Sequence, residues 1–268
     1  MIPVGSTAPR ARLAIVVLAM VAACCGVFLW QQSLSTQESF LVTVHYALIP
    51  LRYSDPAWAI LHGLDPSDYL PYLSMAFLHG GWVHLLANMW TLWLLGRAVE
   101  SRMGGVRFLL LYVLSGLLAS TTHAWINADS FVPTLGASGA IAGVVSAHAA
   151  LFPRSRIVIL VPIVFVPLFF RVPTLVFAAI WFGLQVLQGT TAALGPEAST
   201  GIAWWAHIGG FLAGLVFVAL LTPPETNTPP PDRPTGGPTG RPIGRTVRSN
   251  DQPFGSTRGP TWPDRRLP

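Results

Sequence analysis

A serine and a histidine stand out because each lies at the start of a long apolar segment. Ser138 lies in the sequence GASG, and His207 lies in the sequence WAHIGG. Polar groups at membrane depth are costly, so they are usually paired and often functional. A serine hydroxyl that reaches an imidazole is the smallest arrangement that gives an activated nucleophile. The two residues therefore predict peptide hydrolysis by a serine nucleophile inside a membrane.

The composition indicates that helices crossing a membrane position this pair. Of the 268 residues, 52% are hydrophobic and only 10% are charged, whereas a soluble domain has roughly 25% charged residues. The charges separate uncharged runs, and a spanning helix needs about 20 mostly apolar residues. We predict an all-α membrane protein with six spans, near residues 13–33, 83–98, 106–126, 138–152, 173–190 and 203–222.

The positions of the basic residues, all 16 of which are arginine, indicate the membrane topology of the chain. They precede the first span, lie between spans two and three and between four and five, and follow the sixth, while the alternate segments are mostly acidic. This is the positive-inside pattern, and it predicts that both termini are cytoplasmic. Because the net charge of +5 reflects topology, we expect no nucleic-acid partner.

The composition divides the chain into three predicted segments. Residues 1–12 form a short cytoplasmic lead, residues 13–222 form the membrane domain, and residues 223–268 are a Pro- and Arg-rich cytoplasmic tail that should be disordered. The long external loop 34–80 mixes apolar and polar stretches and could lie in the membrane interface. The run 157–170 is too short to span and contains two prolines, so we expect an interfacial or re-entrant connection.

Ser138 is predicted to lie at a helix N-terminus below the membrane surface. Pro153 follows this helix, which limits it to about 22 Å, less than the roughly 30 Å of a bilayer core. The preceding stretch is apolar but contains Pro133 and Gly136, so it should enter the membrane as a loop beside a wet cavity. A helix N-terminus there favours negative charge and would stabilise an oxyanion.

Small residues recur at a spacing of four near both chemical residues. Gly139 and Gly143 follow Ser138, and Gly210 and Gly214 follow the histidine. Such stripes allow two membrane helices to approach closely, which would bring the hydroxyl near the imidazole. The surrounding spans contain no Asp or Glu, so the pair is predicted to be a dyad.

His84 and Asn88 are four residues apart in the second span and share one helix face. Donors beside a nucleophile can complete an oxyanion hole, although the two residues could instead be interhelical hydrogen-bonding groups, and Ser138 could be a small packing residue. These residues do not form a typical metal set. We therefore expect no metal and no organic cofactor.

Four segments together resemble the rhomboid family of intramembrane serine proteases. Residues 77–88 are FLHGGWVHLLAN, residues 99–104 are VESRMG, residues 136–143 are GASGAIAG and residues 206–210 are AHIGG. The resemblance covers roughly residues 65–221. It implies a six-helix rhomboid bundle whose first external loop is associated with the membrane.

The resemblance also implies roles for individual residues. Ser138 would be the nucleophile and His207 the base, while His84, Asn88 and the backbone N–H of Ser138 would bind the oxyanion. Glu100 and Arg102 match positions that are structural in the family and tie the cytoplasmic loop.

Two departures from the family pattern concern the surroundings of the site. Some members have Tyr or Phe four residues after the serine, stacked on the histidine, whereas this chain has Ala142. Many members also have a Trp-Arg pair in the first external loop, which this chain lacks. Other neighbours would then have to hold the histidine.

The predicted reaction is hydrolysis of transmembrane protein substrates near the outer membrane face, with substrate helices and the lipid bilayer as partners. One alternative is a non-proteolytic rhomboid-like binder of membrane proteins, against which an intact dyad argues. Another is a small transporter, which the lack of internal repeats disfavours. The sequence FPRSRI at 152–157 resembles bacterial members, and the Lys-free, Arg-, Ala- and Pro-rich composition is typical of a GC-rich bacterial genome. We therefore expect a bacterial inner membrane.

Overall fold

The computed structural model describes residues 2–9, 13–163, 166–194 and 203–224, and most of these residues are helical. They belong to one compact unit, Met1–Pro224. The predicted disordered tail lies outside the described residues from position 225 onward.

Within the described residues, four helices are long and apolar enough to cross a membrane. They are α1 (Ile15–Ser33), α8 (Gly105–Ile126), α10 (Thr174–Leu194) and α11 (Trp204–Leu221). These helices correspond to the first, third, fifth and sixth predicted spans. A shorter apolar helix, α9 (Ser138–Leu151), begins at the predicted serine.

The second predicted span, 83–98, is a helical path with a change of geometry inside it. Helix α6 (Trp82–Thr91) continues through a π-helical turn, η2 (Leu92–Gly96), into α7 (Arg97–Met103). Gly104 then has a φ of 84°, a left-handed conformation that glycine adopts without strain. This residue lets α8 begin directly after α7.

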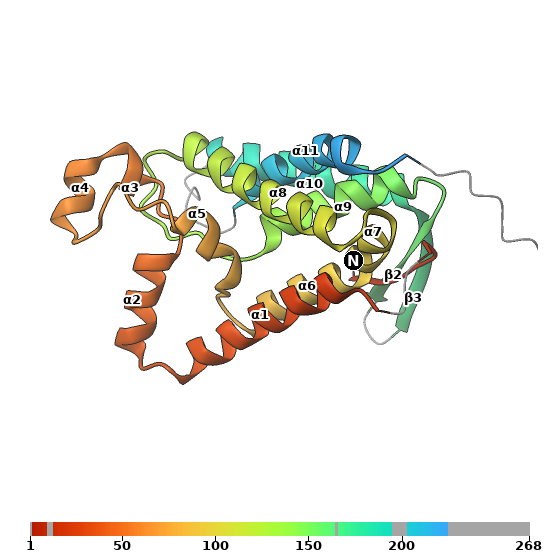
Figure 1. Ribbon diagram of the computed structural model, residues 1–268, viewed down its shortest axis with the longest axis horizontal. Helices are drawn as coiled ribbons and strands as arrows, with labels where there is room; N and C mark the ends of the chain where they lie inside the picture. The colour runs from red at the N-terminus through yellow and green to blue at the C-terminus, as the bar shows by residue number, and fades with distance from the viewer. Residues whose placement is uncertain (1, 10–12, 164–165, 195–202, 225–268) are drawn as a thin grey trace, which may run out of the picture. The chain divides into compact units, whose positions relative to one another are not determined.

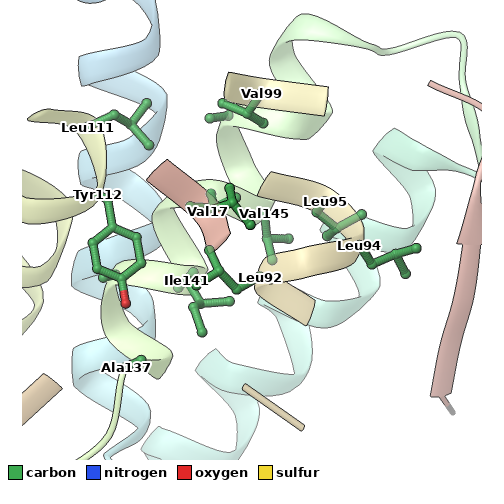
Figure 2. Packing of buried hydrophobic residues seen from close by; sticks show 14 of the residues in the cluster. Val17, Leu92, Leu94, Leu95, Val99, Leu111, Tyr112, Ala137, Ile141 and Val145 are labelled. Carbon is green, nitrogen blue, oxygen red and sulfur yellow. The ribbon is translucent and has the colours of Figure 1, made fainter. Parts of the chain in front are cut away.

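The hydrophobic core lies where α1, η2, α8 and α9 meet. Figure 2 shows its buried side chains, among them Val17 of α1, Leu92 of η2, Leu111 of α8, and Ile141 and Val145 of α9. Helix α9 is buried along nearly its whole length, and in Figure 1 it runs among the other helices. The helix that carries Ser138 is therefore held on several sides.

The first external loop is built from short helices. They are α2 (Thr36–Tyr46), α3 (Leu51–Ser54), α4 (Pro56–Leu61), α5 (Pro71–Ser74) and the 3-10 turn η1 (Met75–Phe77). Ser35 and Glu38 form a reciprocal capping box at the start of α2, an arrangement that satisfies two backbone donors. In Figure 1 the helices α2 to α4 lie at the opposite end of this unit from β2 and β3.

Arg52 holds this loop together from the inside. Its side chain is only 2% exposed. The guanidinium donates to the carbonyl oxygens of Asp65, at 2.9 Å, and His45, at 3.3 Å, and it pairs with the Asp68 carboxylate at 2.9 Å. A planar guanidinium has five donors in a fixed fork and can join several acceptors at once. Although the loop lacks a Trp-Arg pair, it contains a buried arginine.

The expectation of an all-α fold is wrong at one end of the unit, where a three-stranded antiparallel sheet lies. Strand β2 (Arg156–Ile163) pairs with β3 (Val166–Pro173) on one side and with β1 (Ile2–Ser6) on the other. The predicted interfacial or re-entrant connection is thus a hairpin. Its β-branched and aromatic residues favour strands, and Pro162 and Pro167 face each other near its closed end.

Candidate active site

The loop before Ser138 is fixed by the first external loop. Leu48 and Thr134 exchange two backbone hydrogen bonds, at 2.9 and 2.8 Å, and the Gly136 N–H donates to the Met75 carbonyl at 2.8 Å. Gly136 has a φ of 120°, and a Cβ there would lie 2.6 Å from His84 Nε2. Glycine is therefore required both by the backbone and by the neighbouring imidazole.

The structure brings Ser138 and His207 together from two helices. Ser138 is the first residue of α9, and His207 lies in the first turn of α11. The distance between Ser138 Oγ and His207 Nε2 is 2.8 Å, which is within the range of a good hydrogen bond. A serine whose hydroxyl faces an imidazole nitrogen in this way has the geometry of an activated nucleophile.

The two predicted glycine stripes lie against each other. A Cβ at Gly210 would overlap the carbonyl oxygen of Gly139, and a Cβ at Gly214 would overlap that of Gly143. The backbones of α9 and α11 are therefore in direct contact. This close approach places the first turns of the two helices, and hence their side chains, within hydrogen-bonding range.

A cavity of about 710 Å³ lies beside the serine and the histidine. Its walls also include His84 and Asn88, the two residues predicted to bind an oxyanion. The side chain of Asn88 is 7% exposed, and its Nδ2 has no hydrogen-bond partner among the described residues. A buried amide donor without a partner is costly, and this one belongs to a residue that lines the cavity.

His79 lies just outside the spans and contacts the site through His84, the two ring centroids being 5.2 Å apart. Its backbone N–H donates to Gln31 of α1 at 3.1 Å. Burial lowers the pKa of His79 to about 4, with a smaller contribution from His84. His79 is therefore neutral at pH 7 and adds no positive charge beside His84.

A second cavity, of about 450 Å³, reaches the same serine and histidine from between α6 and α10. Apolar side chains from both helices line it, including Trp90 of α6 and Ile180 and Leu184 of α10. These three side chains are also exposed on the surface. The serine and histidine are therefore accessible along an apolar path as well as from the first cavity.

Glu100 and Arg102 join parts of the chain that are distant in sequence. The buried Glu100 carboxylate accepts the backbone N–H groups of Val16, at 3.0 Å, and Val17, at 2.8 Å, at the start of α1. Arg102 donates to the carbonyl oxygen of Pro223, just after α11, at 3.1 Å. The two residues thus tie α7 to the beginning of the first span and to the end of the last.

Sequence reasoning missed three side chains that surround His207. Gln185 Oε1 lies 2.7 Å from His207 Nδ1, and the rings of Trp181 and Trp204 lie 5.9 and 6.2 Å from the imidazole between centroids. A signal for Gln185 was present, because a glutamine within a membrane span is costly unless it has a partner.

Sequence reasoning also missed the role of His123. This histidine of α8 is not among the predicted site residues, but its Nε2 lies 2.9 Å from Thr134 Oγ1, in the loop before Ser138. Among the residues that the structure describes, no three His, Cys, Asp or Glu side chains are grouped to hold a metal.

The comparison with family models finds the rhomboid domain at residues 66–224. Because this match covers more than half of the chain, the chain belongs to the rhomboid family. With its four long apolar helices and the shorter α9, it is a multi-pass integral membrane protein.

Similar proteins occur in plants, fungi and animals. The chain is 35% identical to RHOMBOID-like protein 4 of Arabidopsis thaliana over 159 residues, which are 56% of this chain and 34% of that protein. It is 27% identical to mitochondrial Rhomboid protein 1 of Saccharomyces cerevisiae, over 66% of this chain and 51% of that protein. It is 26% identical to the mitochondrial presenilin-associated rhomboid-like protein of Homo sapiens, over 55% and 37% respectively. The chain thus spans between about a third and about a half of the length of these relatives.

Proposed function

We propose that this protein is an intramembrane serine endopeptidase with a Ser138–His207 dyad. The observation that carries the proposal is the 2.8 Å contact between Ser138 Oγ and His207 Nε2 at the wall of a cavity. Membership of the rhomboid family supports the same chemistry. A packing serine would need neither an imidazole nor a cavity beside it.

The reaction follows general-base and then general-acid catalysis by one histidine. His207 Nε2 takes the hydroxyl proton as Ser138 Oγ attacks the carbonyl carbon of the scissile peptide bond. The tetrahedral intermediate collapses, the C–N bond breaks, and the imidazolium returns the proton to the leaving amine. Water, deprotonated by His207, then hydrolyses the acyl-enzyme and regenerates the serine.

The negative oxygen of the tetrahedral intermediate is stabilised by donors that line the first cavity. Asn88 and His84 both line this cavity, and Asn88 Nδ2 lacks a partner among the described residues. The backbone N–H of Ser138, at the N-terminus of α9, is the third donor of the proposed oxyanion hole.

The substrates are proposed to be transmembrane helices, cleaved near the outer membrane face. The apolar cavity between α6 and α10 supports entry of such a segment from the lipid. Residues that destabilise the substrate helix would favour cleavage, because a helical peptide bond is shielded by its own hydrogen bonds.

The topology of the enzyme follows the distribution of arginines. Together with the four long helices, the α6–η2–α7 path and α9 complete a six-helix bundle, with Glu100 and Arg102 as its structural residues. By the positive-inside rule both termini are cytoplasmic. The Lys-free, arginine-rich composition is typical of a GC-rich bacterial genome, and we therefore propose the inner membrane of a bacterium.

Labelling with a fluorophosphonate probe tests the proposal in detergent-solubilised protein. Wild type should be labelled, and Ser138→Ala and His207→Ala should not. Ser6→Ala is a matched control, because Ser6 Oγ also lies near an imidazole, His148 Nε2 at 3.2 Å, but outside both cavities. Folded wild type that is not labelled would overturn the proposal and favour a non-proteolytic binder. A Ser138→Ala variant that is still labelled would overturn the assignment of Ser138 as the nucleophile.

A further inference from the structure

Gln185 is a buried polar residue on a helix that otherwise turns much of its surface outward. Among the residues of α10 whose burial the structure describes, Thr174, Ala178, Gln185 and Gly189 are buried, and they recur at helical spacing. Gln185 is 6% exposed, whereas Gln188, less than one turn away, is exposed. A buried amide within a membrane is costly unless it is hydrogen-bonded, so the partner of Gln185 is informative.

That partner is the proposed catalytic base. Gln185 Oε1 lies 2.7 Å from His207 Nδ1. An amide oxygen only accepts hydrogen bonds, so in this contact Nδ1 has the proton. The lone pair of the neutral ring is then on Nε2, which faces Ser138 Oγ at 2.8 Å. The three side chains form a directed chain in which serine donates to histidine and histidine donates to glutamine.

Helix α10 also supplies a wall for the imidazole. Trp181, one turn before Gln185, has its ring centroid 5.9 Å from that of His207 at an interplanar angle of 41°. On α9, the position four residues after the serine is Ala142, which is buried and has no ring. The side chains that hold His207 thus come from α10 rather than from the helix of the nucleophile.

We propose that Gln185 is a positioning residue that fixes the tautomer and orientation of His207 for proton abstraction from Ser138. The inference rests on the proposed protease function and adds a third member to its dyad. In serine proteases with a triad, a buried Asp has this role, and replacing it with Asn lowers the rate roughly 10⁴-fold because the histidine then adopts the wrong tautomer. A neutral amide performs the orienting part of that task without burying a charge in the membrane.

The test compares Gln185→Met, which keeps the length of the side chain but removes the acceptor, with Gln185→Glu, which keeps an acceptor oxygen. Gln188→Met is the matched control, because it makes the same change at an exposed position of the same helix. The rate of fluorophosphonate labelling is measured from pH 5 to pH 9. Thermal unfolding in detergent verifies that every variant is folded.

We expect labelling of Gln185→Met to be slower by on the order of tenfold to a hundredfold, less than the loss caused by removing a charged third member. Gln185→Glu should recover most of the rate. Its carboxylate favours the imidazolium, so the acidic limb of its pH–rate profile should move to higher pH. Gln188→Met should match wild type.

The pH shift can be assigned to position 185 because the other titratable groups stay constant among the variants. Those acting on the His207 ring are His84 from α6 and His123 from α8. Helices α10 and α11 have no other titratable side chain, and α9 has only His148, near its far end.

Two results would overturn the inference. One is that Gln185→Met labels like Gln188→Met. The other is that Gln185→Met and Gln185→Glu are slowed equally and keep the wild-type pH profile, which indicates only a packing role.

A failure of the proposed function would be distinguishable, because wild type itself would then not label. In that case the ¹⁵N NMR spectrum of the histidine ring still tests whether Gln185 fixes the tautomer of His207. It should report a protonated Nδ1 at His207 in wild type and a mixture of tautomers in Gln185→Met. A mixture in wild type would contradict the inference.

Discussion

Gly210 of α11 lies against the backbone carbonyl of Gly139 of α9, so closely that a Cβ at position 210 would overlap the carbonyl oxygen. Ser138 directly precedes Gly139, and His207 lies one turn before Gly210. The 2.8 Å distance between the hydroxyl and the imidazole therefore depends on a backbone contact that glycine permits. The packing of α9 against α11 thus sets the geometry of the Ser138–His207 pair.

Gly210→Ala should accordingly lower both stability and activity. Overpacking of this kind costs about 1–3 kcal/mol, and the separation of α9 from α11 should slow labelling of Ser138. The control is Gly183→Ala on α10, where nothing lies within 4 Å of the added Cβ. Thermal unfolding in detergent should place Gly210→Ala below wild type and Gly183→Ala at or above it. Equal unfolding temperatures for the two variants would contradict the argument.

Asn88→Leu should separate stability from catalysis. The substitution removes a buried donor that has no partner among the described residues, so the folded state should be no less stable than wild type. If Asn88 binds the oxyanion, the turnover of a transmembrane substrate should fall about 10²- to 10³-fold. Asn88→Asp, which replaces the donor with an acceptor, should be at least as inactive. Turnover close to that of wild type in both variants would show that Asn88 does not bind the oxyanion.

The sequence predicted the structure best at positions where the residue type has few possible structural roles. The spacing of Gly139, Gly143, Gly210 and Gly214 predicted a close helix pair, and these residues do lie together, because small residues have little other role at such regular spacing. Pro153 likewise predicted the end of a short helix, and α9 ends at Leu151.

Other features could not be read from the sequence because they depend on contacts between distant segments. The strand pairing of β1 with β2 joins residues more than 150 positions apart, and no local pattern specifies it. Gln185 can be recognised in the sequence as a polar residue within a predicted span, but only the packing of α10 against α11 shows that it meets His207. The sequence shows Arg52 only as a charge in an external loop, and its three acceptors become evident only when the loop is folded.

Glu100→Ala should weaken the start of α1. It leaves the backbone N–H groups of Val16 and Val17 without the carboxylate that now accepts them, at a cost of about 1–3 kcal/mol. Glu100→Gln retains one acceptor oxygen and should lose less stability. Chemical denaturation in mixed micelles would measure both, with the exposed Glu38→Gln as a control whose effect should be smaller than that of Glu100→Ala. If Glu38→Gln lost more stability than Glu100→Ala, the contact of Glu100 with the start of α1 would contribute little to the stability of the protein.

The pH dependence of stability should include a contribution from His79. Its pKa is about 4 in the folded protein because of burial, whereas an unfolded histidine has a pKa of about 6.5. The unfolded state therefore binds more protons between these values, and stability should fall as the pH decreases from about 6.5 towards 4. Unfolding temperatures at pH 7 and pH 5 should differ less for His79→Gln than for wild type. Parallel decreases in the two proteins would assign the pH dependence to other groups.

Arg52→Lys should loosen the first external loop although it keeps the charge. A lysine ammonium is a point charge and cannot reproduce the fork that joins His45, Asp65 and Asp68. Buried carbonyls without a donor cost about 1–3 kcal/mol. Limited proteolysis and hydrogen exchange within residues 34–80 should therefore become faster. Arg107→Lys is the matched control, because Arg107 is exposed and its guanidinium makes a long contact of 3.4 Å with the carbonyl oxygen of Met103, at the end of α7.

The loosened loop should also affect the active site. The Leu51 N–H donates to the Ser130 carbonyl, and Leu48 pairs with Thr134, so the first external loop holds the segment that leads into Ser138. Arg52→Lys should therefore slow fluorophosphonate labelling as well as accelerate proteolysis, whereas Arg107→Lys should do neither. Faster proteolysis with an unchanged labelling rate would show that Ser138 is held by α9 and α11 alone, without help from the loop.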